Sequence, residues 1–200
     1  MKKLKYLIIV LVVFLFTGCK DPFTYHEEEK EYLKGLHYVE MKIKNYGVLE
    51  LELDADTAPI TVTNFMELVN DKYYDGLPIH RVQKDFVVQA GNGAEVASIK
   101  GEFDANGKDN NISHKRGVIS MARAGDMSSG YDTASSQFFI MLKDNETLDH
   151  YYAAFGKVTK GMENLDKIAK DVKNTDEMGM IQNEQEMPII EYIKEIEKQG

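Results

Sequence analysis

The feature that most limits how this chain can fold is a pair of segments in which apolar and polar residues alternate, joined by a glycine-containing turn. In the run His37–Lys44, the residues at 37, 39, 41 and 43 share one face. The turn Asn45-Tyr46-Gly47 follows, and Val48–Leu53 alternates between apolar and polar residues again. Runs with a period of two residues on either side of a turn are typical of a β-hairpin. The sequence therefore predicts a hairpin over residues 37–53.

Further strand-like and helical patterns follow the hairpin. Asp56-Thr57-Ala58-Pro59 supplies a cap and an early proline for a helix whose apolar stripe ends near residues 70–72. A second helical stripe spans Gly161–Asp171. Pro188–Ile196 fits a helix by the spacing of its isoleucines and a strand by its β-branched residues, so both remain open. Short apolar runs predict further strands at Leu77–Val82, Phe86–Gln89, Gly117–Met121, Gln137–Leu142 and Phe155–Val158.

The composition excludes several classes of protein. With 200 residues, 43% of them hydrophobic, the chain is expected to form one domain, and its many short strands predict a barrel or a sandwich. A net charge of -9 argues against nucleic-acid binding, which needs a basic surface. The single cysteine excludes an internal disulfide, and His114 and His150 have no partners at ligand spacing. We expect no metal, no cofactor, no nucleic acid and a monomer.

The first residues have the pattern of a signal peptide. Met1–Lys5 is basic, an apolar run extends from Tyr6 to Phe16, and Thr17-Gly18-Cys19 follows. The run is shorter than the about 20 residues of a membrane span. Gly18 before the lone Cys19 resembles a bacterial lipobox, which implies cleavage after residue 18 and a lipid on the Cys19 thiol. The alternative is an uncleaved anchor with an idle thiol.

The segment after Cys19 is rich in charge and has no apolar period. We interpret residues 19–35 as the lipidated cysteine and a flexible tether, although a solvated helix around Glu27–Lys34 is an alternative. The folded domain is then expected over residues 36–198. Together these features predict a protein held by lipid at the cell membrane, on its extracellular side.

Three motifs carry a resemblance to a known family. The first motif combines Ile79-His80-Arg81-Val82 with Phe86-Val87-Val88-Gln89-Ala90-Gly91. The second is Gly117–Arg123. The third is Ser135–Ile140, followed by Leu148-Asp149 and Phe155–Val158. In this order and spacing they resemble the cyclophilin-type peptidyl-prolyl cis-trans isomerases, from about residue 37 to 197. The resemblance implies a mainly β fold, a closed eight-stranded antiparallel barrel capped by two α-helices. It also implies that the last segment is a closing strand.

The resemblance also implies which residues form the site. Arg81 matches the family's catalytic arginine, and Gln89 and Phe139 act with it. Val87 stands where a methionine is common, and Tyr152 stands where many eukaryotic members carry histidine. The implied substrate-binding residues are Phe86, Val87, Met121, Ala122, Gln137, Leu148 and Tyr152.

These residue types suit rotation about an X–Pro bond. The rotation must break amide resonance, with a barrier of about 18–20 kcal/mol, and needs no nucleophile, metal or redox centre. In the twisted state the prolyl nitrogen gains a lone pair, so a fixed donor such as Arg81 would stabilise it more than the planar amide. Apolar residues would grip the proline ring. The reaction needs no proton transfer, so we interpret His80 as structural.

Three functions remain open at this point. The first is an exported, lipid-anchored isomerase that acts on proline-containing polypeptides and assists their folding outside the cytoplasm. The second is a binding module that holds proline-containing segments, with turnover incidental. The third, a small-molecule-binding lipoprotein, is disfavoured by the barrel-like pattern. The segment Gly125–Ala134 is longer than in compact members of the family and borders the expected pocket.

Overall fold

The computed structural model describes residues 30–124 and 130–198. The predicted signal peptide, Cys19, most of the tether and part of the 125–134 loop lie outside the described residues. Among the helices of the described part, none is both long and apolar enough to span a membrane. The predicted hairpin is present, as strands β1 (Leu36–Ile43) and β2 (Gly47–Asp54), paired so that Val39 faces Leu51. Their alternating residues are buried, as the period-two pattern requires.

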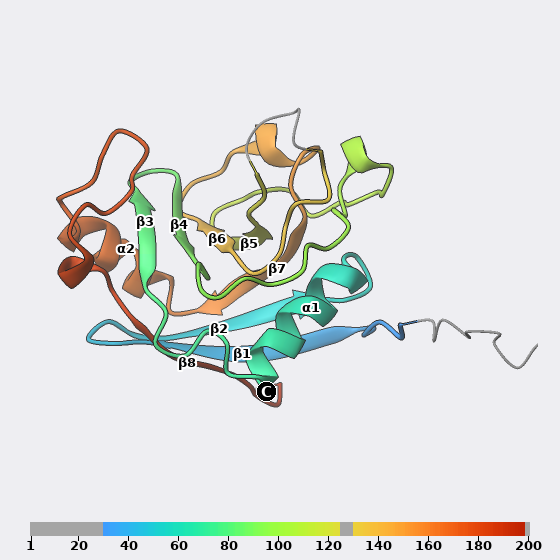
Figure 1. The fold of residues 1–200 in the computed structure, drawn as a ribbon, viewed down its shortest axis with the longest axis horizontal. Coiled ribbons are helices and arrows are strands. Elements are labelled where there is room, and N and C mark those ends of the chain that lie inside the picture. The colour runs from blue at the N-terminus through green and yellow to red at the C-terminus, as the bar shows by residue number, and fades with distance from the viewer. Residues whose placement is uncertain (1–29, 125–129, 199–200) are drawn as a thin grey trace, which may run out of the picture. The chain divides into compact units, whose positions relative to one another are not determined.

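Eight antiparallel strands form one sheet in the order β3-β4-β6-β5-β7-β2-β1-β8 (Figure 1). The segment that stayed open between helix and strand is a strand, β8, paired with β1. The remaining strands are β3 (Ile79–Gln83), β4 (Val87–Ala90), β5 (Val118–Met121), β6 (Phe138–Met141), β7 (Ala154–Lys160) and β8 (Ile190–Glu195).

The expectation of a closed barrel was wrong, because the sheet is a curled half-barrel that stays open between β3 and β8. An isolated bridge, Pro78 to Ile189, and a hydrogen bond from the Gly76 amide to the Ile190 carbonyl at 2.8 Å join the start of β8 to the segment that precedes β3. The free edge of β3 is taken instead by the loop 174–181. The Val82 amide donates to the Gly179 carbonyl at 2.8 Å, and the Ile181 amide donates to the His80 carbonyl at 2.9 Å. A ladder with β8 is therefore excluded along most of β3.

Both predicted helices form. Helix α1 (Pro59–Asn70) packs against β2 and β8, and α2 (Met162–Asp171) buries Leu165 and Ile168 (Figure 1). The expected cap from Asp56 or Thr57 is absent, since the residue before α1 makes no side-chain cap hydrogen bond. A carboxylate from a distant part of the chain caps the helix instead. Glu102, only 1% exposed, accepts hydrogen bonds from the amides of Ile60 at 3.1 Å and Thr61 at 2.8 Å.

The Glu102 cap leads to a stability prediction. In Glu102→Gln, one amide oxygen replaces two carboxylate oxygens, and the new NH₂ group meets a backbone donor. We expect a loss of about 1–3 kcal/mol in the free energy of unfolding, measured by urea denaturation. The control is Glu163→Gln, an exposed acid in the first turn of α2, with an expected loss of a few tenths of a kcal/mol. Equal losses in both variants would contradict the capping role.

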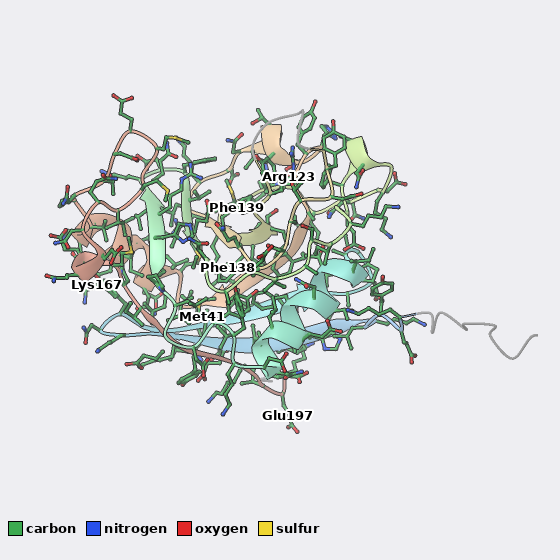
Figure 2. The ribbon with its side chains drawn as sticks, in the orientation of Figure 1. Met41, Arg123, Phe138, Phe139, Lys167 and Glu197 are labelled. Carbon is green, nitrogen blue, oxygen red and sulfur yellow. The ribbon has the colours of Figure 1, made fainter. Side chains whose placement is uncertain are left out.

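Two apolar clusters lie on opposite faces of the central strands. The main core contains an aromatic group in which Phe65 packs on Tyr74, Phe138 and Phe155, with ring centroids 5.1–5.6 Å apart. The second, smaller cluster comprises Val87, Val118, Phe139, Met141 and Ala154. Adjacent residues on a strand point to opposite faces, which is why Phe138 belongs to the core and Phe139 to the second cluster. In Figure 2, Phe138 lies toward Met41 and Phe139 toward Arg123.

Candidate active site

Arg81 on β3 is held by three hydrogen-bond acceptors. Its Nε donates to the Met178 carbonyl at 2.7 Å, one terminal nitrogen donates to Gln89 Oε1 at 3.0 Å, and the other donates to Gln83 Oε1 at 2.7 Å. Its guanidinium also lies 5.6 Å from the centre of the Phe86 ring. Burial lowers the pKa of Arg81, with Tyr152 and Asp176 opposing the shift, but an arginine remains charged at neutral pH. The side chain is therefore a fixed, half-buried cation.

A row of side-chain amides supports this arginine from behind. Gln89 faces Arg81 across the β3–β4 pair. The Gln89 amide nitrogen donates to Gln137 Oε1 at 3.1 Å, and Gln137 in turn donates to Asn92 Oδ1 at 3.3 Å. Since each amide both accepts and donates, the row orients Gln89 Oε1 toward Arg81. Asn92 belongs to the Gly91-Asn92-Gly93 break that follows β4.

Arg81 stands at the edge of an apolar pocket of about 300 Å³. Val87 and Phe139 of the second apolar cluster form its floor, and Phe139 from β6 is the largest buried ring there. The Tyr152 ring meets the Phe139 ring edge-on at 5.6 Å. Its lining residues are Arg81, Phe86, Val87, Gln89, Ala122, Arg123, Phe139, Leu148, Tyr152 and Met178.

Eight of the ten predicted site residues meet at this pocket, and two do not. Gln137 does not line the pocket, but its side chain accepts from Gln89 and its backbone carbonyl accepts from the Ala122 amide at 2.8 Å. Met121 is 1% exposed and belongs to the main core. Its partner across β5 and β6 is Phe138, so Met121 faces the interior with Phe138 while its neighbour Ala122 lines the pocket. The alternation of the strand explains this difference from the expectation.

Two residues that the sequence reasoning missed also line the pocket. Arg123 directly follows the Ser120-Met121-Ala122 motif, so its place in the sequence could have indicated that it lines the pocket. Met178 lies 97 positions from Arg81, in the loop 174–181, and no local pattern marks it. Asp176 shapes that loop by accepting hydrogen bonds from the amides of Met178 and Met180 at 2.9 and 2.8 Å.

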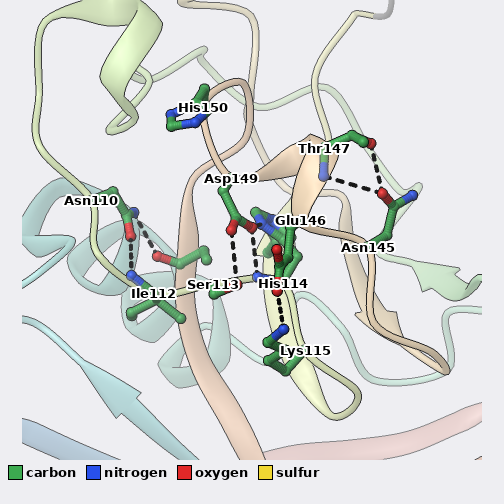
Figure 3. A network of polar contacts seen from close by, with 12 residues as sticks. Asn110, Ile112, Ser113, His114, Lys115, Asn145, Glu146, Thr147, Asp149 and His150 are labelled. Carbon is green, nitrogen blue, oxygen red and sulfur yellow. Dashed lines mark hydrogen bonds and ion pairs between the residues drawn. The ribbon is translucent and has the colours of Figure 1, made fainter.

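A buried histidine supports Phe139 from below. The His114 ring is stacked on Phe139, with centroids 6.0 Å apart and an angle of 19°. Its Nδ1 lies 2.8 Å from Asp149 Oδ1 and its Nε2 lies 3.0 Å from Ser120 Oγ. The Ser113 hydroxyl donates to the same carboxylate (Figure 3). A neutral ring that donates from Nδ1 to Asp149 accepts at Nε2 from Ser120. This network ties the Leu148–Tyr152 turn to β5.

Burial lowers the pKa of His114, and the hydrogen bond and charge of Asp149 oppose that shift only in part. The unfolded chain therefore takes up the proton more readily than the folded protein. The stability due to neutral His114 is fully present above the unfolded pKa of about 6.5 and is lost as the pH falls below it. His80, whose pKa burial also lowers, contributes in the same direction.

We expect the free energy of unfolding to fall as the pH is lowered from about 7.5 to 5.5, by up to about 1.4 kcal/mol per pH unit for each such histidine. Thermal and urea denaturation at several pH values measure this slope. His114→Gln keeps a polar group in the site but does not titrate, so its slope should be shallower. A wild-type profile that is flat over this range would contradict the neutral, buried state.

No three His, Cys, Asp or Glu side chains of the described residues are grouped as metal ligands. His150 forms a pair with Asp104 at 2.7 Å rather than a larger cluster. The groups that line the pocket are two guanidinium groups, the side-chain amide of Gln89, a methionine thioether, and aromatic and aliphatic side chains.

Comparisons with known proteins agree with this geometry. The sequence model of the "Cyclophilin type peptidyl-prolyl cis-trans isomerase/CLD" family matches residues 38–193. The chain is 42% identical over 151 residues to peptidyl-prolyl cis-trans isomerase A of Dickeya dadantii, covering 72% of this chain and 76% of that protein. It is 40% identical over 136 residues to peptidyl-prolyl cis-trans isomerase B of Bacillus subtilis, covering 65% of this chain and 86% of the relative.

Solved structures give the same result. A cyclophilin type peptidyl-prolyl cis-trans isomerase of Cryptosporidium parvum is similar with a TM-score of 0.69 and 26% identity, covering 82% of this chain and all of the other. A crystal structure of the same protein in the presence of the dipeptide Ala-Pro has a TM-score of 0.67 and 27% identity, over 80% of this chain and 99% of the other. The fold, the pocket and the matched sequence together show that this chain is an isomerase of the cyclophilin type peptidyl-prolyl cis-trans isomerase family.

Proposed function

We propose that this chain accelerates rotation about X–Pro bonds in exported polypeptides and that Arg81 is its catalytic residue. The position of Arg81 carries the proposal. Three acceptors hold its guanidinium at the edge of an apolar pocket. An arginine has five N–H groups, so two remain to donate to a substrate. Because the donors are already oriented, little reorganisation is needed when the substrate amide twists.

The chemistry of the rotation matches this arrangement. As the X–Pro bond twists, resonance is lost and the prolyl nitrogen becomes pyramidal with a free lone pair. An N–H of Arg81 then donates to that nitrogen, an interaction that the planar amide cannot make. An acceleration of 10⁴–10⁵ needs about 5.5–7 kcal/mol of such differential stabilisation. No covalent bond forms and no proton is transferred.

The other pocket residues bind and orient the substrate. Phe139 and Leu148 form apolar walls against which a proline ring can pack. Gln89 keeps Arg81 in place through its 3.0 Å hydrogen bond. We assign Phe86, Val87, Ala122 and Tyr152 to the remaining contacts with the substrate. An apolar pocket also removes the amide from water, which disfavours its charge-separated resonance form.

Export and membrane attachment belong to the same proposal and rest on the sequence. The basic start, the short apolar run and the Gly18-Cys19 pair support cleavage after residue 18 and a lipid on Cys19. A tether over residues 19–35 would hold a monomeric domain near the outer face of the membrane. There it would meet secreted chains whose X–Pro bonds isomerise slowly, over tens to hundreds of seconds without a catalyst.

The lipid anchor has a direct test. A bacterium that expresses the full chain is grown with a radioactive fatty acid. The wild-type protein should carry the label and sediment with membranes, and added protease should digest it in intact cells. Cys19→Ser should remove the label, because Cys19 supplies the only thiol in the sequence. A labelled Cys19→Ser protein, or a wild-type protein without label, would contradict the anchor.

The isomerase activity is tested with proline peptides that hold a measurable cis fraction. The purified full chain should accelerate the cis-to-trans step at substoichiometric concentration, whether followed by protease coupling or by NMR exchange. If the chain binds these peptides without accelerating the step, it is a binding module instead. Size-exclusion chromatography of the same sample checks the monomer.

A further inference from the structure

A second arginine, Arg123, borders the same pocket as Arg81 and is also fixed in place. Its Nε donates to the Tyr151 carbonyl at 2.8 Å, and a terminal nitrogen donates to the Ala124 carbonyl at 3.2 Å. The side chain is half-buried. Hydrogen bonds to two backbone carbonyls reduce the rotamer freedom that a surface arginine normally keeps.

Three aromatic rings surround this guanidinium. Its central carbon lies 4.9 Å from the centre of the Tyr152 ring, 5.3 Å from that of Tyr131 and 5.5 Å from that of Phe103. Cations are attracted to the faces of such rings. Tyr152 also packs on Phe139, so Arg123 is held in contact with the pocket wall rather than in open solvent.

The charge of the pocket is opposite to the charge of the chain. Arg81 and Arg123 both line it, and no Asp or Glu is among its described lining residues, although the chain carries a net charge of -9. The third arginine, Arg116, shows the usual arrangement, in which both oxygens of Asp166 accept from one terminal nitrogen at 2.7–2.8 Å. Among the described residues, Arg123 has no carboxylate within 4.0 Å.

We propose that Arg123 is a specificity-determining residue that binds a carboxylate of the substrate, from an Asp or Glu within two residues of the proline. This inference rests on the proposed function, because it assigns the substrate class of the same pocket. Among residues 30–124 and 130–198, one terminal nitrogen of Arg123 has no hydrogen-bond partner and the other has one N–H unused, which leaves donors for a carboxylate. Lysine or arginine at the same substrate position would be repelled.

The test is a peptide series that differs only in the residues beside the proline. Each position, one or two residues before or after the proline, carries Glu, Gln or Lys in turn, and kcat/KM is measured for each peptide. At one or more positions, we expect the wild type to prefer Glu over Lys by about fivefold to tenfold, with Gln between them. The ratio should shrink as the salt concentration rises, because the interaction is partly exposed.

Arg123→Gln should reduce the Glu-to-Lys ratio to about twofold, the remainder coming from Arg81. Arg123→Lys keeps the charge and should retain a larger part of the ratio, which a purely structural role would not predict. Arg116→Gln is the matched control, since it removes the same charge outside this pocket and should leave the ratio unchanged. Thermal unfolding of each variant checks that it is folded.

Two results would overturn the proposal: a wild-type ratio below about twofold at every position, or the same loss of ratio in Arg123→Gln and Arg116→Gln. If Arg123→Gln does not fold, a wild-type ratio below about twofold at every position still overturns the proposal, and the ratio kept by Arg123→Lys is compared with that of Arg116→Gln. Failure of the proposed function looks different. In that case the neutral Gln peptides would not be isomerised at all, whereas failure of this inference leaves them as good substrates.

Discussion

Replacing Arg81 by alanine should lower kcat/KM for X–Pro isomerisation by about 100-fold, the loss typical of removing a donor that acts mainly on the transition state. Because the planar substrate gains little from this donor, most of the loss should fall on kcat rather than KM. The substitution also leaves the side chains of Gln83 and Gln89 without their shared donor. Both are half-buried and can turn to water, so the fold should persist.

Two control variants make the Arg81 experiment specific. Arg81→Lys keeps a cation but cannot reach its three acceptors with the same planar fork, so its activity should lie between wild type and Arg81→Ala. Lys84→Ala removes a positive charge from the β3–β4 turn, outside the pocket, and should retain wild-type activity. Near-wild-type activity in Arg81→Ala, with an unchanged melting temperature, would rule out the assigned role.

Replacing either of two adjacent phenylalanines by alanine should affect different properties: Phe138→Ala mainly stability, and Phe139→Ala mainly activity. Phe138→Ala removes a ring packed edge-on against Phe65 and Tyr74 in the main core. It should lower the free energy of unfolding by about 3–5 kcal/mol, because a large cavity remains among fixed neighbours. Phe139→Ala opens a space that joins the solvent-accessible pocket, so water can fill it and the loss of stability should be smaller.

For activity, the order of the two variants should be reversed, with the larger loss in Phe139→Ala. Phe139→Ala removes the largest ring of the pocket floor and should reduce kcat/KM at least about tenfold, since even one methylene group in an apolar pocket is worth roughly 1–3 kcal/mol. Phe138→Ala, assayed well below its melting temperature, should lose less. Urea denaturation and the peptide assay on the same two proteins make the comparison. Equal effects on both properties would mean that the two faces of β6 are not divided between core and site.

Local patterns predicted most of the elements of this fold. The hairpin of β1 and β2 follows from strict alternation around Gly47, and α1 follows from an apolar stripe after Pro59. Both depend on interactions between residues close in sequence, which is why their bounds agree with the structure within a few residues. The spacing of apolar residues in Pro188–Ile196 fitted a helix as well as a strand, and the segment is a strand because it pairs with β1.

The sequence motifs also named most of the pocket. Arg81, Gln89 and Phe139 come from three different strands, yet β3, β4 and β6 are neighbours in the sheet, so the side chains meet. Their proximity depends on strand order, which the motifs imply only through the family resemblance. The family resemblance also placed Met121 among the substrate-binding residues, but strand alternation directs it to the core.

Only the tertiary structure decided the features built by residues far apart in the chain. Glu102 caps α1 from 41 and 42 residues away, and Met178 reaches Arg81 from a loop that also keeps β3 from pairing with β8. His114 likewise pairs with the distant Asp149, and its ring stacks on Phe139. The sequence by itself determined both helices, the strands other than β8 and the family motifs, because these depend on near neighbours. The open edge, the cap and the support of the pocket depend on packing between distant segments, which no local pattern encodes.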